Sequence, residues 1–147
     1  MNIGEVKIAK SKSELKNIID LRYKILREPW QQAYDSSSDE LEESSVNAYI
    51  KLDEKIVACG RLQNNGSGIG QIRYMAVDSN QQGKGLGKLI LKKLEEEAVK
   101  IGLKTIELQA RENALEFYKA NNYIIVEKSF KLWDIIQHYK MAKQLND

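Results

Sequence analysis

The sequence has few of the residues that build disulfides and metal sites. Its 147 residues include one cysteine, Cys59, and one histidine, His138. A single cysteine excludes an internal disulfide and is the usage expected in a reducing cytoplasm. One cysteine with one histidine also argues against a zinc site. We therefore expect a cytoplasmic protein without a metal centre, in which Cys59 is a small core residue of a strand over 56–59.

Long apolar runs are also missing, and residues 1–5 do not have the form of a signal peptide, so neither a membrane span nor a leader is expected. A net charge of +2 gives no strong attraction to nucleic acid or to an anionic membrane. Hydrophobic residues make up 42% and charged residues 30%, as in globular proteins. These values predict a single domain over 1–147, which is compatible with a homodimer.

A glycine-rich segment, Gln82-Gly83-Lys84-Gly85-Leu86-Gly87, is the most informative feature of the chain. It follows a strand-like run over 72–77 and precedes a helical pattern over 86–102. The first N–H groups of a helix lack intrahelical partners and lie at its positive end, so they attract anions. Glycines let a phosphate approach that backbone closely. The segment therefore predicts a phosphate-binding turn, although a simple glycine-rich connection before an amphipathic helix remains the alternative.

Two common phosphate loops do not fit this segment. A P-loop needs glycine at the position of Gln82 and serine or threonine at the position of Leu89. A dinucleotide-binding fingerprint needs G-x-G-x-x-G directly after its strand, whereas these glycines alternate strictly and are offset by a loop. Nucleotide binding is thus a weak alternative.

Two motifs carry a resemblance to a known family. Gln82-x-x-Gly85-x-Gly87 resembles the Q/R-x-x-G-x-G/A signature of the GNAT N-acetyltransferase superfamily, whose members bind the pyrophosphate of acetyl-coenzyme A there. Downstream, the segment 114–123 resembles the family's A-x-x-F-Y-x-x-x-G-[FY] segment. Asn122 replaces its usual glycine, and asparagine is the next-best residue for a left-handed helix end.

The order of predicted elements also agrees with this family. We expect strands over 6–9, 46–52, 55–62, 72–77, 104–110, 123–127 and 135–141. We expect helices from a capping box at Ser11–Glu14 to Pro29, over 86–102 and over 112–120, with a short helix near 39–43. A tight hairpin is expected at 53–54 and a turn at 64–68. The pattern implies an α/β fold with a mixed sheet. The resemblance implies that this sheet is GNAT-like, mostly antiparallel and twisted, and flanked by helices.

The resemblance implies where acetyl-coenzyme A binds. Backbone groups of one strand end pair with the pantetheine arm, and the glycine segment holds the pyrophosphate with added attraction from Lys84 and Lys88. The implied cofactor-binding residues are Met75, Ala76, Val77, Gln82, Gly83, Lys84, Gly85, Leu86, Gly87 and Lys88. The family's cofactor-contacting asparagine is Arg111 here, so that contact is not carried over.

The resemblance also implies Tyr118 as the general acid, because a phenol stays protonated at neutral pH and can donate to the departing thiolate. Packing as a half-buried aromatic on the stripe of its helix is the alternative. The general base is left open, since no acid lies between Gln63 and Val77 and Arg73 stands in the strand where many members carry a glutamate. His138 is one candidate, because it titrates near neutrality. Glu40 and Glu42 are others.

The acceptor site has conflicting signals. Arg22 lies on the apolar stripe of the first helix, where either a buried acid neutralises it or it faces a cleft and binds an anionic substrate. With Arg27, Trp30 and Arg73 it forms the predicted substrate-binding set. Residues 28–50, however, contain no lysine or arginine and six acids, which is either a solvated loop or a wall that favours a cationic amine.

The sequence therefore predicts an acyl-coenzyme A-dependent N-acetyltransferase that moves an acetyl group from acetyl-coenzyme A to a primary amine by direct attack. The acceptor is expected to be a small molecule, because no extended docking surface is visible, with no nucleic-acid or membrane partner. A non-catalytic acyl-coenzyme A binding or sensing module is the alternative, supported by the missing strand glutamate.

Overall fold

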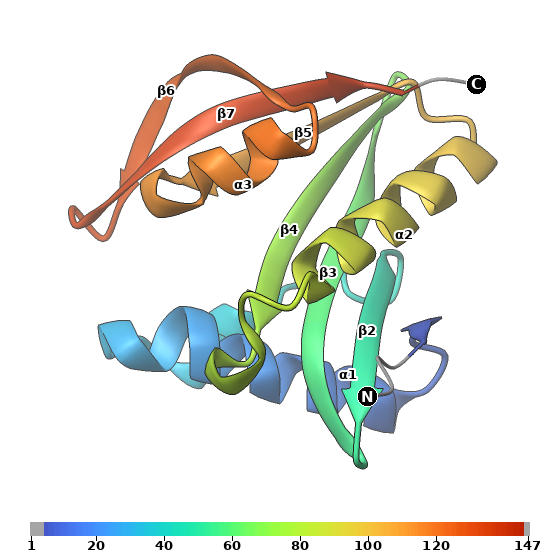
Figure 1. The fold of residues 1–147 in the computed structure, drawn as a ribbon, viewed down its shortest axis with the longest axis vertical. Coiled ribbons are helices and arrows are strands. Elements are labelled where there is room, and N and C mark those ends of the chain that lie inside the picture. Colours follow the sequence, from blue (N-terminus) through green and yellow to red (C-terminus); the bar gives the residue numbers. More distant parts are fainter. Residues whose placement is uncertain (1–4, 146–147) are drawn as a thin grey trace.

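The computed structural model describes residues 5–145, and all strands in this range form one twisted sheet (Figure 1). Their order across the sheet is β1-β2-β3-β4-β5-β7-β6. The strands are β1 (Val6–Ile8), β2 (Val46–Leu52), β3 (Lys55–Gly66), β4 (Ile69–Val77), β5 (Thr105–Arg111), β6 (Ile124–Leu132) and β7 (Ile136–Gln144). Only β4 and β5 pair in parallel, because the helix between them carries the chain back across the sheet. The predicted mixed, mostly antiparallel α/β fold is confirmed.

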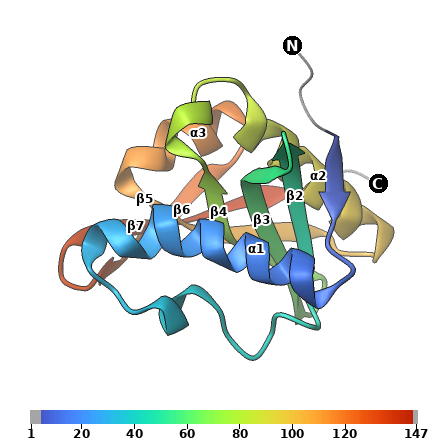
Figure 2. The same cartoon turned by 90° about the horizontal axis from the view of Figure 1, so that it is seen from below.

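The helices cover the two faces of this sheet. They are α1 (Lys12–Arg22), α2 (Leu86–Lys100) and α3 (Leu115–Ala120). Successive strand residues point to opposite faces. Ala48 and Ala58 belong to the core under α2, whereas Tyr49 and Cys59 belong to the core under α1. Figure 2 shows α1 running across the strands from the side opposite α2. No helix within 5–145 is long and apolar enough to cross a membrane.

The start of α1 agrees with the predicted capping box. Ser11 Oγ accepts a hydrogen bond from the backbone N–H of Glu14 at 3.2 Å. The expected helical path to Pro29 is confirmed, but its geometry is not uniform, because the α-helical part ends at Arg22. The chain continues as a short π-helix over Tyr23–Arg27 and a 3₁₀ turn over Glu28–Trp30. Proline has no N–H to extend a helix, so the chain leaves helical geometry in steps around Pro29.

The short helix expected near 39–43 is also wrong. Residues 40–44 form turns, and a 3₁₀ turn occupies Tyr34–Ser37 instead. Asp39 Oδ1 accepts from the backbone N–H of Leu41 at 2.9 Å, an Asx-type bond that competes with helix formation.

Several strands are longer than the sequence indicated. The tight hairpin at Asp53–Glu54 is confirmed, and both residues have positive φ. β3, however, continues to Gly66 and turns at Ser67-Gly68, so the expected turn over 64–68 starts too early. β6 and β7 extend to a second tight turn at Trp133-Asp134. Most of β6 is exposed, so no alternation of buried residues marks its length.

Candidate active site

The centre of the sheet opens where β4 and β5 separate. Their parallel pairing ends at Ile72 and Leu108, although both strands continue beyond these residues. The last residues of β4, 73–77, therefore have no partner strand on the β5 side. Figure 1 shows the two strands diverging between α2 and α3. Such an edge offers free backbone groups to an extended ligand.

A bulge in β4 lies at this opening. Arg73 pairs with Arg61 and Ala76 with Cys59, so two residues, Tyr74 and Met75, face Gly60 alone. Tyr74 has a φ of 57°, a conformation that is unfavourable for a residue with a side chain. A Cβ on Gly60 would lie 2.5 Å from Met75 Sδ, so glycine permits this close approach. Bulges commonly occur beside active sites, where they redirect side chains.

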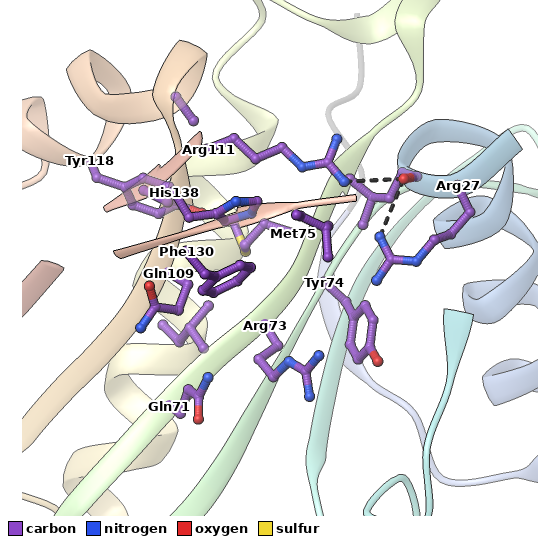
Figure 3. A pocket seen from close by; sticks show the side chains of 15 residues that line it. Arg27, Gln71, Arg73, Tyr74, Met75, Gln109, Arg111, Tyr118, Phe130 and His138 are labelled. Atoms are coloured by element: carbon purple, nitrogen blue, oxygen red, sulfur yellow. Dashed lines mark hydrogen bonds between the residues drawn. The ribbon is translucent and has the colours of Figure 1, made fainter. Parts of the chain in front are cut away.

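A cavity of about 300 Å³ fills the opening (Figure 3). It brings together five of the predicted site residues: Tyr118, His138, Met75, Arg27 and Arg73. Two residues that the sequence analysis did not assign, Arg111 and Phe130, also line it. Arg22 and Trp30 do not line it.

The glycine segment lies between β4 and α2. Gly83 and Gly85 both have a φ of 81°, so the backbone needs glycine at these two positions. Gly85 caps α2 without a side-chain hydrogen bond. Within residues 5–145, the backbone N–H groups of 83–88 have no hydrogen-bond acceptor. The turn therefore presents several free donors at the positive end of a 15-residue helix, which suits a diphosphate.

Buried Asp78 anchors this turn to the end of β4. Its Oδ1 accepts from the backbone N–H of Asn80 at 3.0 Å, and Lys55 Nζ lies 3.1 Å from its Oδ2. The hydrogen bond to Asn80 and the two lysine neighbours lower the pKa of Asp78. Gln82 Nε2 donates to the carbonyl of Val77 at 3.2 Å, which ties the signature glutamine to the predicted pantetheine strand. Lys84 and Lys88 are exposed.

Tyr118 is a buried side chain of α3 that lines the cavity. Its ring packs edge-on against Phe117 and Tyr123, at centroid distances of 5.0 and 5.8 Å. Its hydroxyl has no hydrogen-bond partner among the described residues. Burial raises the pKa of Tyr118 above its ordinary value of 10, so the phenol keeps its proton at neutral pH.

His138 enters the same cavity from β7. Its Nδ1 lies 3.0 Å from the carbonyl of Ile136, and because a carbonyl only accepts, Nδ1 carries the hydrogen. Burial, reinforced by the charges of Arg111 and Arg27, lowers the pKa of His138 below 6.5. The imidazole is therefore neutral at pH 7, with a lone pair on Nε2. Phe130 stacks on the ring at 4.5 Å and fixes its plane.

The other two candidate bases lie away from this arrangement. Glu40 is exposed and does not line the cavity. Glu42 is buried beside Arg22, with oxygen–nitrogen distances of 2.6 and 3.1 Å. His138 is thus the one candidate base of the three that lines the cavity.

A buried ion network explains the position of Arg22. Its guanidinium also donates to Asn47 at 2.6 Å, and the side chain is 0% exposed. Arg61 binds Asp39 at 2.7 Å and Glu42 at 2.9 Å. Of the two roles considered for Arg22, the structure shows the first: a buried acid, Glu42, neutralises the guanidinium, which does not face the cavity.

This network also accounts for part of the acidic segment. Asp39 binds Arg73 at 3.2 Å in addition to Arg61, and these contacts lower the pKa of its carboxyl. The guanidiniums of Arg22, Arg61 and Arg73 lie 4.4–4.9 Å from the centre of the Tyr74 ring. In the described part of the chain, no carboxylate lines the cavity. The wall of carboxylates, one of the two interpretations of the segment 28–50, is therefore not at this site.

Arg27 and Arg111 meet at one end of the cavity. Arg27 Nη1 and Arg111 Nη2 both donate to the carbonyl oxygen of Leu26, at 3.2 and 3.1 Å, as the dashed lines of Figure 3 show. Arg111 was missed because its position matches a cofactor-contacting asparagine in the family. In the sequence, Arg111 could have been noticed as the last residue of a strand of alternating pattern, 105–111. In the sheet, it is the register partner of His138 across β5 and β7.

The fold and this cavity define a coenzyme A-dependent acyltransferase, and comparison with protein families agrees. The model of the acetyltransferase (GNAT) family matches residues 15–123, more than half of the chain. The chain belongs to this family and is an acyl-coenzyme A-dependent acetyltransferase that uses acetyl-coenzyme A. This membership favours the enzyme over the non-catalytic binding module.

Individual proteins are similar to this chain in sequence or in fold. The chain is 29% identical to the uncharacterized N-acetyltransferase YjcF of Bacillus subtilis, over 92% of this chain and 96% of that protein. A crystal structure assigned to an N-acetyltransferase from Lactobacillus plantarum superposes with a TM-score of 0.86 at 20% identity, covering 99% and 100% of the two chains. An aminoglycoside 6'-N-acetyltransferase complexed with coenzyme A gives 0.80 at 17% identity, covering 97% and 98%.

Proposed function

We propose that this enzyme transfers the acetyl group of acetyl-coenzyme A to the primary amine of a small molecule by direct attack. One observation carries the proposal: Tyr118, His138 and the unpaired end of β4 border the same cavity. An acid, a base and free backbone donors are the groups that this reaction requires.

The donor site follows from the free backbone groups. The N–H groups of 83–88 hold the diphosphate, and Lys84 and Lys88 add attraction to its charge. Met75, Ala76 and Val77 pair with the pantetheine arm along the free edge of β4. An N–H of this segment polarises the thioester carbonyl, a contact that typically lowers the barrier by roughly 3 kcal/mol.

The chemical step uses the two titratable side chains. His138 Nε2 accepts a proton from the attacking amine, whose nitrogen forms the new bond to the carbonyl carbon. The bond between that carbon and sulfur breaks, and Tyr118 donates its proton to the departing thiolate. The low pKa of His138 and the high pKa of Tyr118 keep each group in the protonation state that its role needs at pH 7.

Thiol release from acetyl-coenzyme A tests this proposal against a panel of amines, amino acids, polyamines and aminoglycosides. We expect release that depends on the acceptor and yields an N-acetylated product by mass spectrometry. Coenzyme A, but not ATP or NAD, should raise the melting temperature, because a ligand stabilises only the state it binds. Stabilisation by ATP or NAD instead, with no thiol release, would reject the proposal.

The same proposal places the enzyme in the cytoplasm, on the basis of its single, buried cysteine. It assigns no nucleic-acid or membrane partner. A homodimer is compatible with it, and sedimentation equilibrium measures the oligomeric state directly.

A further inference from the structure

The cavity contains two arginines, Arg27 and Arg111, whose charges no carboxylate in the described part of the chain neutralises. Within residues 5–145, neither Arg27 nor Arg111 forms a salt bridge. Their hydrogen bonds go to main-chain carbonyls, the shared one of Leu26 and, for Arg27, that of Ser36 at 3.1 Å. A carbonyl dipole satisfies a donor but does not balance a full charge.

The contrast with the other arginines is informative. Arg22 and Arg61 have carboxylate partners at 2.6–2.9 Å, and Arg73 has Asp39 at 3.2 Å. Asp39 and Glu42 therefore neutralise these three arginines, which surround the Tyr74 ring. The protein leaves Arg27 and Arg111 uncompensated although two carboxylates, Asp39 and Glu42, lie on the same side of the sheet.

Holding these two charges together is unfavourable in the absence of an anion. Burial, and secondly the charge of Arg27, lowers the pKa of Arg111 to about 10. Burial lowers the pKa of Arg27 as well. An anion between the guanidiniums would relieve both the repulsion and the desolvation, and planar guanidiniums bind carboxylate and phosphate oxygens in pairs.

This anion subsite lies next to the predicted base. Arg111 is the register partner of His138 across β5 and β7, and Arg27 and His138 line the same cavity. The rest of the lining includes Leu26, Phe130 and Leu132, which suit an apolar portion. A molecule that carries its anionic group close to its amine can reach the arginines and the base together.

We infer that the acceptor is a primary amine that also carries an anionic group, a carboxylate or a phosphate, bound by Arg27 and Arg111. This inference rests on the proposed function and narrows its substrate. Cationic acceptors such as polyamines and aminoglycosides are excluded by it, because they would meet two unpaired guanidiniums and no carboxylate.

Matched acceptors test the inference. Leucine and phenylalanine are each assayed as the free acid, the primary amide and the aminophosphonate, so that only the anionic group changes. We expect kcat/KM at least tenfold higher for an anionic form than for the amide. The better of the acid and the aminophosphonate identifies the group that the site prefers. Equal or faster reaction of the amides or of a polyamine would overturn the inference while leaving the acetyltransferase proposal intact.

Variants connect this preference to the two arginines. Arg27→Gln and Arg111→Gln should each raise KM for the anionic acceptor at least tenfold, while KM for the amide and KM for acetyl-coenzyme A change much less. Lys7→Gln, which removes one exposed charge from β1, is the matched control and should change none of these values. A retained preference for the anionic form in both arginine variants would count against the assignment.

A binding measurement keeps the two proposals separable. Calorimetry with the coenzyme A-loaded protein compares the acid, the aminophosphonate and the amide of each compound without turnover. If no compound releases thiol but the anionic forms bind at least tenfold more tightly, the anion subsite stands and the proposed function fails. If no form binds preferentially, the subsite itself is rejected.

Discussion

Arg22 and Glu42 form a two-pronged ion pair in the interior, with nitrogen–oxygen distances of 2.6 and 3.1 Å and side-chain exposures of 0% and 8%. Glu42 also binds Arg61 at 2.9 Å, so one carboxylate serves two buried guanidiniums. Both arginine side chains are fully buried in the structure.

Replacing Glu42 should therefore destabilise the protein strongly. Glu42→Gln leaves two buried cations without this charge partner, and the loss of one member of a buried pair typically costs about 3–5 kcal/mol. Urea unfolding followed by circular dichroism measures the change in the free energy of unfolding. Asp20→Asn is the control, because its pair with Lys16 is exposed and should be worth less than about 1 kcal/mol, and the amide oxygen can still accept the hydrogen bond from the Tyr34 hydroxyl. A loss for Glu42→Gln no larger than that of Asp20→Asn would contradict this account.

The two glycines of the signature should respond differently to alanine. Gly85→Ala places a side chain at a φ of 81° and should cost about 1–2 kcal/mol of stability. It should also raise KM for acetyl-coenzyme A, because the turn would leave the backbone conformation in which its N–H groups point to the diphosphate. Gly87 lies inside α2 without positive φ, and its added Cβ would meet the Phe117 ring at 3.3–3.4 Å and Val77 Cγ2 at 3.8 Å, all of them side-chain atoms. Gly87→Ala should therefore cost less on both measurements, and the reverse order would argue against the backbone role of Gly85.

Tyr118→Phe should separate catalysis from binding. The hydroxyl has no hydrogen-bond partner within 5–145, so its removal should leave the melting temperature nearly unchanged. We expect kcat to fall about a hundredfold or more, the usual contribution of a general acid, with the affinity for coenzyme A retained. Tyr139→Phe removes a hydroxyl that binds Glu112 at 3.1 Å outside the cavity and serves as the control. Unchanged turnover in Tyr118→Phe would remove this residue from the mechanism.

The pH profile should report His138. Because its pKa is lowered, the base is neutral and active at pH 7, and kcat/KM should fall only as the pH drops through a value below 6.5. His138→Gln should lower kcat/KM at pH 7 and abolish this acidic limb. Arg111→Gln removes a nearby positive charge and should move the limb to higher pH. An acidic limb that persists unchanged in His138→Gln would assign the titration to another group.

The sequence predicted the features that depend on neighbouring residues. Ser11 and Glu14 cap α1, the hairpin at Asp53–Glu54 turns tightly, and Asn122 has a φ of 73° in the place of glycine. Each of these is decided by contacts or backbone preferences within a few residues, which the order of amino acids displays directly. The alternation of buried residues along β4 and β5 is local in the same sense.

Only the tertiary structure decided which charged residues form ion pairs and which do not. The sequence could not tell whether Arg22 faced an acid or a cleft, because Glu42 reaches it only after the segment 28–45 folds back under the sheet. It could not show that Arg27 and Arg111, which lie far apart in the chain, both bind the Leu26 carbonyl. Packing of distant elements sets which guanidiniums receive a carboxylate, and so it decided the charge of the cavity.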